Sequence, residues 1–338
     1  MAASTITLPS EKRFLFLGAG PALKCFLAIF GRTNRTAGHA AAVYSDSTLD
    51  EQWSPDGDSL STVCQENGLP LVDGADGATT LQDTVHTTDA NICVVFGWNR
   101  ILGREILQRF QDRIFNFHTG PLPRFRGAGG FSWQVLNNER SVSITIHVMR
   151  EKIDDGPIIL QHAAELQGDT FTPQDIYAVR ERLYRETVFP ELSRLLVDSD
   201  AIPAREPDRG RATYFPMLDT RQNGFLDFSW TPEQFSRFVR AFSDPYPGAI
   251  FTYGSARYHV RRCAIVERNE DHHPFCRGLI TNVTDDGVSC FVGGGIVALM
   301  DITDSDGRAV GYDAFREGNR LFNTDADIMS SILYRPRP

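Results

Sequence analysis

A short stretch in the middle of the chain, residues 114–160, gathers the side chains best suited to chemistry. Asn116 and His118 stand two residues apart in an apolar run, and Asp154 and Asp155 precede a Gly-Pro turn. Residues two apart on a strand face the same way, so the amide and the imidazole can address one substrate atom. An amide stabilises an oxyanion, an imidazole moves protons near neutral pH, and a carboxylate orients the imidazole or a water. The stretch therefore predicts acyl-type transfer.

The same stretch lacks the residues of covalent catalysis. It has no Gly-x-Ser-x-Gly motif and no cysteine, so an activated serine or cysteine nucleophile is not expected. Spacing alone also allows a structural interpretation, in which Asn116 is a turn residue, His118 a buried histidine and Asp154 a solvated loop acid.

Strand patterns surround these residues. Alternating apolar residues predict a strand over 142–148, and the continuous apolar run 91–98 is typical of a buried parallel strand. An earlier apolar run, 13–17, is followed by Gly18-Ala19-Gly20 and an apolar helical segment, which is a common opening of an α/β sheet. Ligands of such sheets bind beyond the carboxyl ends of the strands, so residues 98–102 are expected beside Asn116.

The glycine pair Gly18 and Gly20 resembles half of a dinucleotide fingerprint. The third glycine is missing and no acid follows at a suitable distance, so a tight structural turn is favoured over a nucleotide site.

Length and composition narrow the class of protein. A chain of 338 residues predicts two domains, and 41% hydrophobic with 23% charged residues describes an ordinary soluble protein. The net charge of -9 argues against a nucleic-acid partner. Six scattered cysteines without a CxxC pair indicate reduced thiols and no metal site. With no apolar run of membrane length, we expect a cytoplasmic protein without a membrane partner.

The order of the motifs resembles one known family. Asn-x-His at 116–118 precedes Leu-Pro-x-Phe-Arg-Gly at 122–127, Ile-Thr-Ile-His at 144–147 and Asp-x-Gly-Pro-Ile at 154–158. This order is similar to that of the 10-formyltetrahydrofolate-dependent formyltransferases, which include glycinamide ribonucleotide, methionyl-tRNA and sugar-nucleotide N-formyltransferases. The resemblance implies 10-formyltetrahydrofolate as co-substrate and a catalytic trio of Asn116, His118 and Asp154.

Binding residues also follow from the resemblance. A flat pterin ring needs apolar walls and backbone hydrogen-bond partners. The residues expected to line its pocket are Phe96, Trp98, Arg100, Leu102, Leu107 and Asp154. Arg124 and Arg126, in a glycine-rich loop, are expected to bind a substrate phosphate, with pairing to acids or solvent as the alternative. His147 is expected to support the site more than to act directly. Gly120 and Pro121 depart from the family, which usually has Ser and Leu there, so the shape of this loop stays open.

The resemblance covers most of the chain and implies a catalytic domain at 1–203, a linker at 204–211 and a second domain at 212–338. The Pro-Tyr-Pro-Gly-Ala turn at 245–249 is similar to the second domain of methionyl-tRNA and aminosugar formyltransferases. Short strands after this turn predict a small open barrel. The predicted fold class is α/β, with a Rossmann-like, mostly parallel sheet followed by a smaller β-rich, OB-like barrel.

The function implied is transfer of a formyl group to a primary amine, most of all the amine of a nucleotide-linked amino sugar. An amino acid or hydroxyornithine in siderophore or antibiotic assembly is the competing acceptor. Methionyl-tRNA ranks third, because segment 45–61 is acidic where the tRNA enzymes carry a basic loop. A formyltetrahydrofolate hydrolase is the alternative outside transfer, and a homodimer is compatible with each of these.

Overall fold

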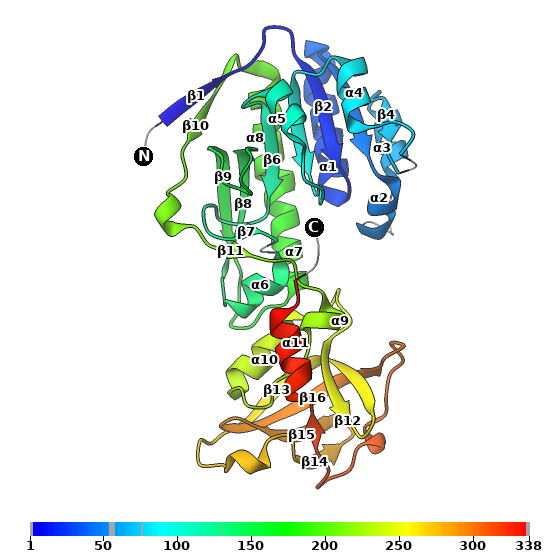
Figure 1. Cartoon of the computed structure of the whole chain (residues 1–338), viewed down its shortest axis with the longest axis vertical. Coiled ribbons are helices and arrows are strands. Elements are labelled where there is room, and N and C mark those ends of the chain that lie inside the picture. The colour runs from blue at the N-terminus through cyan, green and yellow to red at the C-terminus, as the bar shows by residue number, and fades with distance from the viewer. Residues whose placement is uncertain (1–2, 54–57, 76, 129, 336–338) are drawn as a thin grey trace.

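The computed structural model describes residues 3–53, 58–75, 77–128 and 130–335 of the chain. Figure 1 shows an upper part built around a large sheet and a lower part built around a smaller one, stacked along the long axis. Over the ranges just given, no helix is both long enough and apolar enough to cross a membrane.

Five parallel strands form one half of the upper sheet. In spatial order they are β4 (Leu71–Asp73), β3 (Ala40–Ser45), β2 (Arg13–Gly18), β5 (Ile92–Phe96) and β6 (Ile114–His118). Every residue of β5 is buried, as expected for a strand that is covered on both faces. The predicted α/β fold is therefore confirmed, and the carboxyl ends of these strands meet at one edge of the sheet.

Four antiparallel strands complete the sheet beyond β6. They are β8 (Ser141–Val148), β9 (Ile158–Glu165), β10 (Ala201–Arg205) and β1 (Ala3–Thr7). The sheet is thus mixed, and the description "mostly parallel" fits only its first half. Strand β10 overlaps the start of the segment 204–211 that the sequence predicts as a linker, because β10 pairs with the distant β1.

Helices cover both faces of this sheet. On one face α1 (Pro21–Ala37) and α8 (Phe189–Asp198) pack on each other over a core rich in phenylalanine. Residues of α4 (Leu81–Thr88) and α5 (Arg104–Phe110) join the core on the opposite face. The remaining helices of the upper part are α2 (Ser47–Trp53), α3 (Leu60–Glu66) and α6 (Phe131–Leu136).

Helix α7 (Pro173–Leu183) begins at a capping box. The Thr172 side chain accepts from the Asp175 N–H and the Asp175 carboxylate accepts from the Thr172 N–H, with proline in the first turn. A π-helical turn, Tyr184–Val188, joins α7 to α8, so one continuous element extends from the upper sheet toward the lower part (Figure 1).

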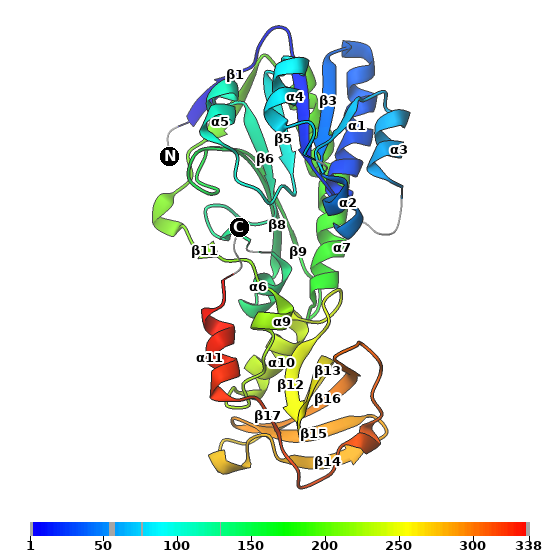
Figure 2. The same cartoon turned by 45° about the vertical axis from the view of Figure 1, so that its right-hand side comes forward.

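The lower part is a curled antiparallel sheet. Its six strands lie in the order β14 (Ile280–Thr284), β15 (Gly287–Val292), β16 (Gly295–Asp304), β13 (Ala256–Arg268), β12 (Ala249–Tyr253) and β17 (Leu321–Phe322). Helix α10 (Pro232–Ala241) packs on β13, while α9 (Thr220–Asn223) and α11 (Asp325–Leu333) lie beside each other (Figure 2). The predicted β-rich second domain is confirmed as a half-barrel.

Residues 206–219, called the connecting segment below, run from β10 to α9 between the two parts (Figure 2). Its strand β11 (Tyr214–Phe215) pairs in parallel with β7 (Arg126–Gly127), in the loop after β6. The Trp133 indole N–H donates to the Pro216 carbonyl at 2.7 Å. Side chains of both parts share one core, which includes Val135, Val142, Phe171, Phe235, Phe242 and Phe251. The two parts are therefore packed together.

Candidate active site

Successive residues of strand β6 face two different environments. Phe115 and Phe117 point into the phenylalanine-rich core, whereas Ile114, Asn116 and His118 alternate onto the opposite face. Asn116 stands opposite His147 of β8 in the antiparallel register, and the Asn116 Nδ2 lies 3.1 Å from the His147 Nε2. The boundary between the parallel and antiparallel halves of the sheet therefore carries three polar side chains.

Asp154 completes this group from the loop after β8. Its φ of +49° turns the backbone so that one carboxylate oxygen accepts from the Gly127 N–H at 2.8 Å and lies 3.5 Å from the His118 Nδ1. The other oxygen lies 3.3 Å from the His147 Nε2. The structure thus brings together the predicted trio, with His147 between the amide of Asn116 and the carboxylate.

The neighbouring acid, Asp155, takes a different role. It is 5% exposed and forms ion pairs with Arg126 and, at 3.4 Å, with Arg209. This placement agrees with the assignment of Asp154, and not Asp155, to the candidate trio.

Both ring nitrogens of His118 lie near oxygen atoms. Its Nε2–H donates to the Phe125 carbonyl at 2.7 Å, and its Nδ1 faces Asp154. Burial lowers the pKa of His118 below its ordinary value, even though the charge of Asp154 acts to raise it. The resting imidazole is therefore neutral near pH 7.

The Asp154 carboxylate remains ionised. Burial alone would raise the pKa of this carboxyl, but the hydrogen bond with His147, the positive charge available on His118 and the Gly127 N–H together lower it to about 2. A permanent negative charge beside His118 favours a proton arriving on the imidazole.

A cavity of about 420 Å³ adjoins the loop that carries Asp154. Leu107 and Met149 are its apolar lining residues, and the rest of the lining is polar or charged: Arg104, Gln108, Gln111, Asp112, Arg150, Glu151, Lys152, Asp155 and Arg209. Leu107 and Met149 pack on the same core cluster as Leu102, and Trp98 packs there too. Among the predicted pterin residues, Leu107 lines the cavity, while Trp98 and Leu102 belong to the core cluster that Leu107 and Met149 also contact.

Two other predicted pterin residues lie elsewhere. Phe96 is fully buried on the opposite face of the sheet, where its ring contacts Phe26, Phe117 and Phe189, so its side chain does not line a pocket. Arg100 forms an ion pair with the buried Asp46, and its guanidinium lies 5.4 Å from the centre of the Trp98 ring.

The arginines expected at a phosphate are already paired. Arg124 lies 2.7 Å from Glu139, and the largely buried Arg126 faces Asp155. Both side chains therefore match the alternative of pairing with acids. The turn at Gly20 is also structural, because the Gly20 N–H donates to the Asp50 carboxylate at 2.9 Å.

Sequence reasoning gave His147 a supporting role and gave no role to the backbone at Phe125 and Gly127. The register opposite Asn116 is the signal that could have placed His147 within the group, since the strand 142–148 was predictable. The Phe125 carbonyl and Gly127 amide carry no side-chain signal, so the sequence could not reveal them.

Models of known protein families match both parts of the chain. The family model described as formyl transferase matches residues 12–186, and the model described as formyl transferase, C-terminal domain, matches residues 220–320. The chain belongs to the formyl transferase family. The two matches correspond to the upper sheet with its helices and to the curled lower sheet.

Curated relatives of this formyltransferase include methionyl-tRNA formyltransferases. Methionyl-tRNA formyltransferase of Thermotoga neapolitana is 28% identical over 242 residues, covering 71% of this chain and 74% of the relative. The methionyl-tRNA formyltransferase of Myxococcus xanthus is 28% identical over 231 residues, covering 68% of this chain and 71% of the relative.

Solved structures share the fold. The sugar 3N-formyltransferase WlaRD, determined with dTDP and 5-N-formyl-THF, has a TM-score of 0.62 at 17% identity and covers 86% of this chain and 98% of its own. The Helicobacter canadensis N-formyltransferase, determined with folinic acid and dTDP-3-aminofucose, has a TM-score of 0.62 at 16% identity, with 86% and 99% covered. Methionyl-tRNA formyltransferase of Clostridium thermocellum has a TM-score of 0.51 at 16% identity, with 75% and 93% covered.

Proposed function

We propose that this formyltransferase moves the formyl group of 10-formyltetrahydrofolate to the primary amine of a nucleotide-linked amino sugar. The observation that carries the proposal is the convergence of Asn116, His118 and Asp154 at one edge of the sheet, with a cavity beside the loop that carries Asp154. An amide, a neutral imidazole and an ionised carboxylate are the groups that acyl transfer between two amines requires.

The proposed reaction starts with a neutral amine, which attacks the formyl carbon and forms the new C–N bond. Asn116 donates a hydrogen bond to the oxygen as it gains charge. The neutral His118 accepts the amine proton at Nδ1, where Asp154 stabilises the resulting cation. His118 then returns that proton to the folate nitrogen as the old C–N bond breaks, giving tetrahydrofolate and the formamide.

The pterin is proposed to bind in the cavity beside Asp154. Leu107 and Met149 would contact the flat ring, and the backbone of residues 150–152 would meet its polar edge. Binding of folate compounds by WlaRD and the Helicobacter canadensis enzyme, which share this fold, supports the same co-substrate here.

The choice of acceptor rests on charge. Segment 45–61 contains five acids and neither lysine nor arginine, and the chain as a whole carries a net charge of -9. A tRNA acceptor requires positive charge against its phosphates, which favours a small acceptor. Methionyl-tRNA, third by charge alone, becomes the second candidate because the curated relatives at 28% identity are methionyl-tRNA formyltransferases.

The test compares acceptors at fixed 10-formyltetrahydrofolate. Release of tetrahydrofolate is measured with dTDP-3-aminofucose, with a dTDP-linked 4-amino sugar, with methionyl-tRNA and with no amine. The proposal expects tetrahydrofolate and a formylated sugar in equal amounts, with little turnover on the other two. Transfer to methionyl-tRNA alone would establish the second candidate, and formate release without any amine would indicate a hydrolase.

A further inference from the structure

Two loops supply the groups around His118 and Asp154. The loop after β6 contributes the Phe125 carbonyl, which accepts the His118 N–H at 2.7 Å, and the Gly127 N–H, which donates to Asp154 at 2.8 Å. The loop after β8 carries Asp154 itself. Contacts from outside the sheet must therefore fix these loops if the imidazole and the carboxylate are to keep their geometry.

The connecting segment holds the first loop by its backbone. The Phe125 N–H donates to the Thr213 hydroxyl at 3.0 Å, and the Arg126 N–H donates to the Thr213 carbonyl at 2.9 Å. In return the Thr213 N–H donates to the Pro123 carbonyl at 3.3 Å. A single threonine thus contacts three residues of the loop on which His118 depends.

Phe125 requires such support. Its φ of +59° lies in the left-handed region, which a bulky residue rarely adopts unless its surroundings enforce it. The ring is buried against Phe215 of the connecting segment, with the ring centres 4.7 Å apart. The Thr213 hydroxyl fixes the amide end of the same residue whose carbonyl end accepts from His118.

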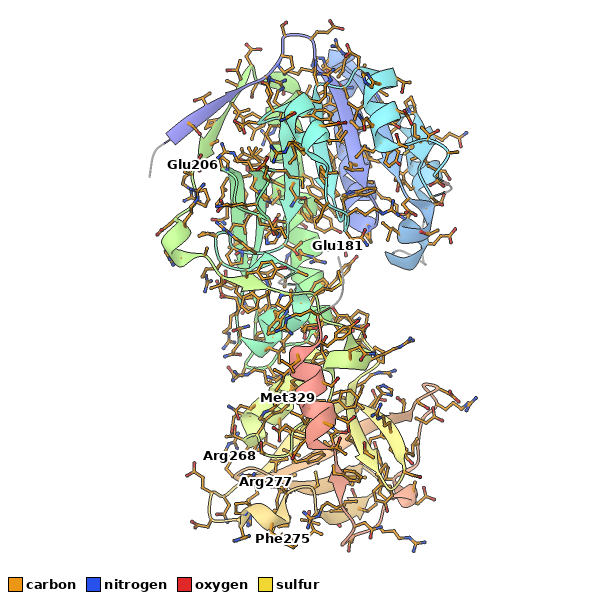
Figure 3. The ribbon with its side chains drawn as sticks, viewed as in Figure 1. Glu181, Glu206, Arg268, Phe275, Arg277 and Met329 are labelled. Atoms are coloured by element: carbon orange, nitrogen blue, oxygen red, sulfur yellow. The ribbon has the colours of Figure 1, made fainter. Side chains whose placement is uncertain are left out.

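The connecting segment also reaches the second loop. Arg209 pairs with Asp155, the residue next to Asp154, and Glu206, labelled in Figure 3, pairs with Arg150 at 3.4 Å. Arg209 is 63% exposed and the Glu206 pair is exposed on both sides, so these contacts add little energy. The hydrogen bonds of Thr213, of which the one from the Phe125 N–H is partly buried, are the stronger link.

We infer that Thr213, which lies between the two domains, is a positioning residue for His118 and Asp154. Its hydroxyl fixes Phe125, and Phe125 fixes the tautomer and orientation of the imidazole. This inference rests on the proposed function of His118 and Asp154 and deepens it. The connecting segment would then support the formyl transfer reaction as well as join the two domains covalently.

Removal of the hydroxyl has a defined consequence at His118. Without it the Phe125 N–H has lost its acceptor, and the Phe125 carbonyl is held less firmly beside the imidazole, although the backbone hydrogen bonds of Thr213 to Pro123 and Arg126 remain. The hydrogen bond from His118 to this carbonyl raises the pKa of His118, so its loss moves the titration to lower pH. The cavity walls at Leu107 and Met149 are not touched, so affinity for folate is expected to stay unchanged.

The test reads His118 directly, by NMR of ¹⁵N-labelled imidazoles over a pH series. Thr213→Val keeps the shape of the side chain and removes the acceptor, whereas Thr213→Ser keeps the hydroxyl. We expect the valine variant to move the His118 midpoint to lower pH, with rescue by serine. His162, which pairs with Glu191 on the outer part of the sheet, is the internal reference and should not shift.

Thr252→Val is the matched control, because the Thr252 hydroxyl also makes one hydrogen bond, to Asn323 at 3.1 Å, in the lower sheet. It should leave His118 unchanged. Thr213→Ala serves for the same titration if the valine variant does not fold. If the titration midpoint of His118 is unchanged in folded Thr213→Val or Thr213→Ala, the inference is overturned. Failure of the wild type to transfer formyl groups would instead refute the proposed function, and the titration would still report on Thr213.

Where an acceptor is found, kinetics add a second measurement. The positioning role predicts a kcat about tenfold lower for Thr213→Val with the KM for folate close to wild type, since displaced groups slow the reaction more than they weaken binding. An equal loss in Thr252→Val would point to general destabilisation and contradict the role.

Discussion

The two faces of strand β6 serve different purposes. On one face Phe115 and Phe117 pack in a core where phenylalanine rings from three strands and two helices meet, some edge to face and some tilted. On the other face Asn116 and His118 stand at the end of the strand, each within reach of a group from β8 or the loop beyond it. Alternation along five residues thus separates the groups that stabilise the fold from the groups proposed to do chemistry.

The largest effect is expected from a substitution in the apolar core on one side of the sheet. Phe96→Ala should lower the free energy of unfolding by about 3–5 kcal/mol, because it leaves a cavity among Phe26, Phe117 and Phe189. Urea unfolding measures the loss. Affinity for folate, measured on the folded fraction, should not change, since the side chain lies away from the cavity at Leu107. Selective loss of folate binding with normal stability would restore Phe96 to the pterin site.

The polar face should respond in the opposite way. Asn116→Ala removes the proposed oxyanion donor, and the rate of formyl transfer should fall roughly 100- to 1000-fold. The melting temperature should change little, because Asn116 contributes one partly buried hydrogen bond. Single-turnover kinetics with circular dichroism as the folding control measure both quantities. Near-normal turnover in a folded variant would remove Asn116 from the mechanism.

Gly120 lies two residues beyond the end of β6, close to the His118 ring. A Cβ at this position would lie 3.0 Å from the His118 Nε2 and 3.0 Å from the Phe125 Cβ, so Gly120→Ala must push the imidazole or the loop by a few tenths of an ångström. We expect a rate loss of about tenfold with the fold intact. Steady-state kinetics at saturating folate test this, and an unchanged kcat would show that the loop yields without moving His118.

The smallest expected effect is on stability as a function of pH. Burial lowers the pKa of His118 in the folded protein, so below about pH 6.5 the unfolded chain takes up a proton that the folded protein resists. The stability contribution is therefore complete above that pH and is lost as pH falls toward the folded pKa. Melting temperatures of wild type and His118→Gln between pH 5 and 7.5 should converge on the acid side. If the melting temperatures of the two proteins change in parallel with pH, the lowered pKa of His118 is contradicted. His162→Gln is the control.

Much of this arrangement was predictable because its signals are local. The apolar run of β5, the alternation of β8 and the capping residues Thr172 and Asp175 each identify an element without help from the rest of the chain. The trio of Asn116, His118 and Asp154 was recognisable from motif order.

What the sequence did not reveal depends on contacts between distant residues. Strand β1 forms only by pairing with β10, and the hold of Thr213 on Phe125 spans 88 positions. The neutral state of His118 follows from burial, which no motif encodes. Phe96 was misplaced for a different reason: it shares a face with Ile92 and Val94, and the period of the strand would have assigned it to the core.

A structure with 5-formyltetrahydrofolate bound tests the central claim most directly. The account predicts the pterin between Leu107 and Met149, with the formyl oxygen within hydrogen-bond reach of the Asn116 Nδ2 and the formyl carbon beside His118. A folate bound elsewhere, or one whose formyl group points away from both side chains, would contradict it.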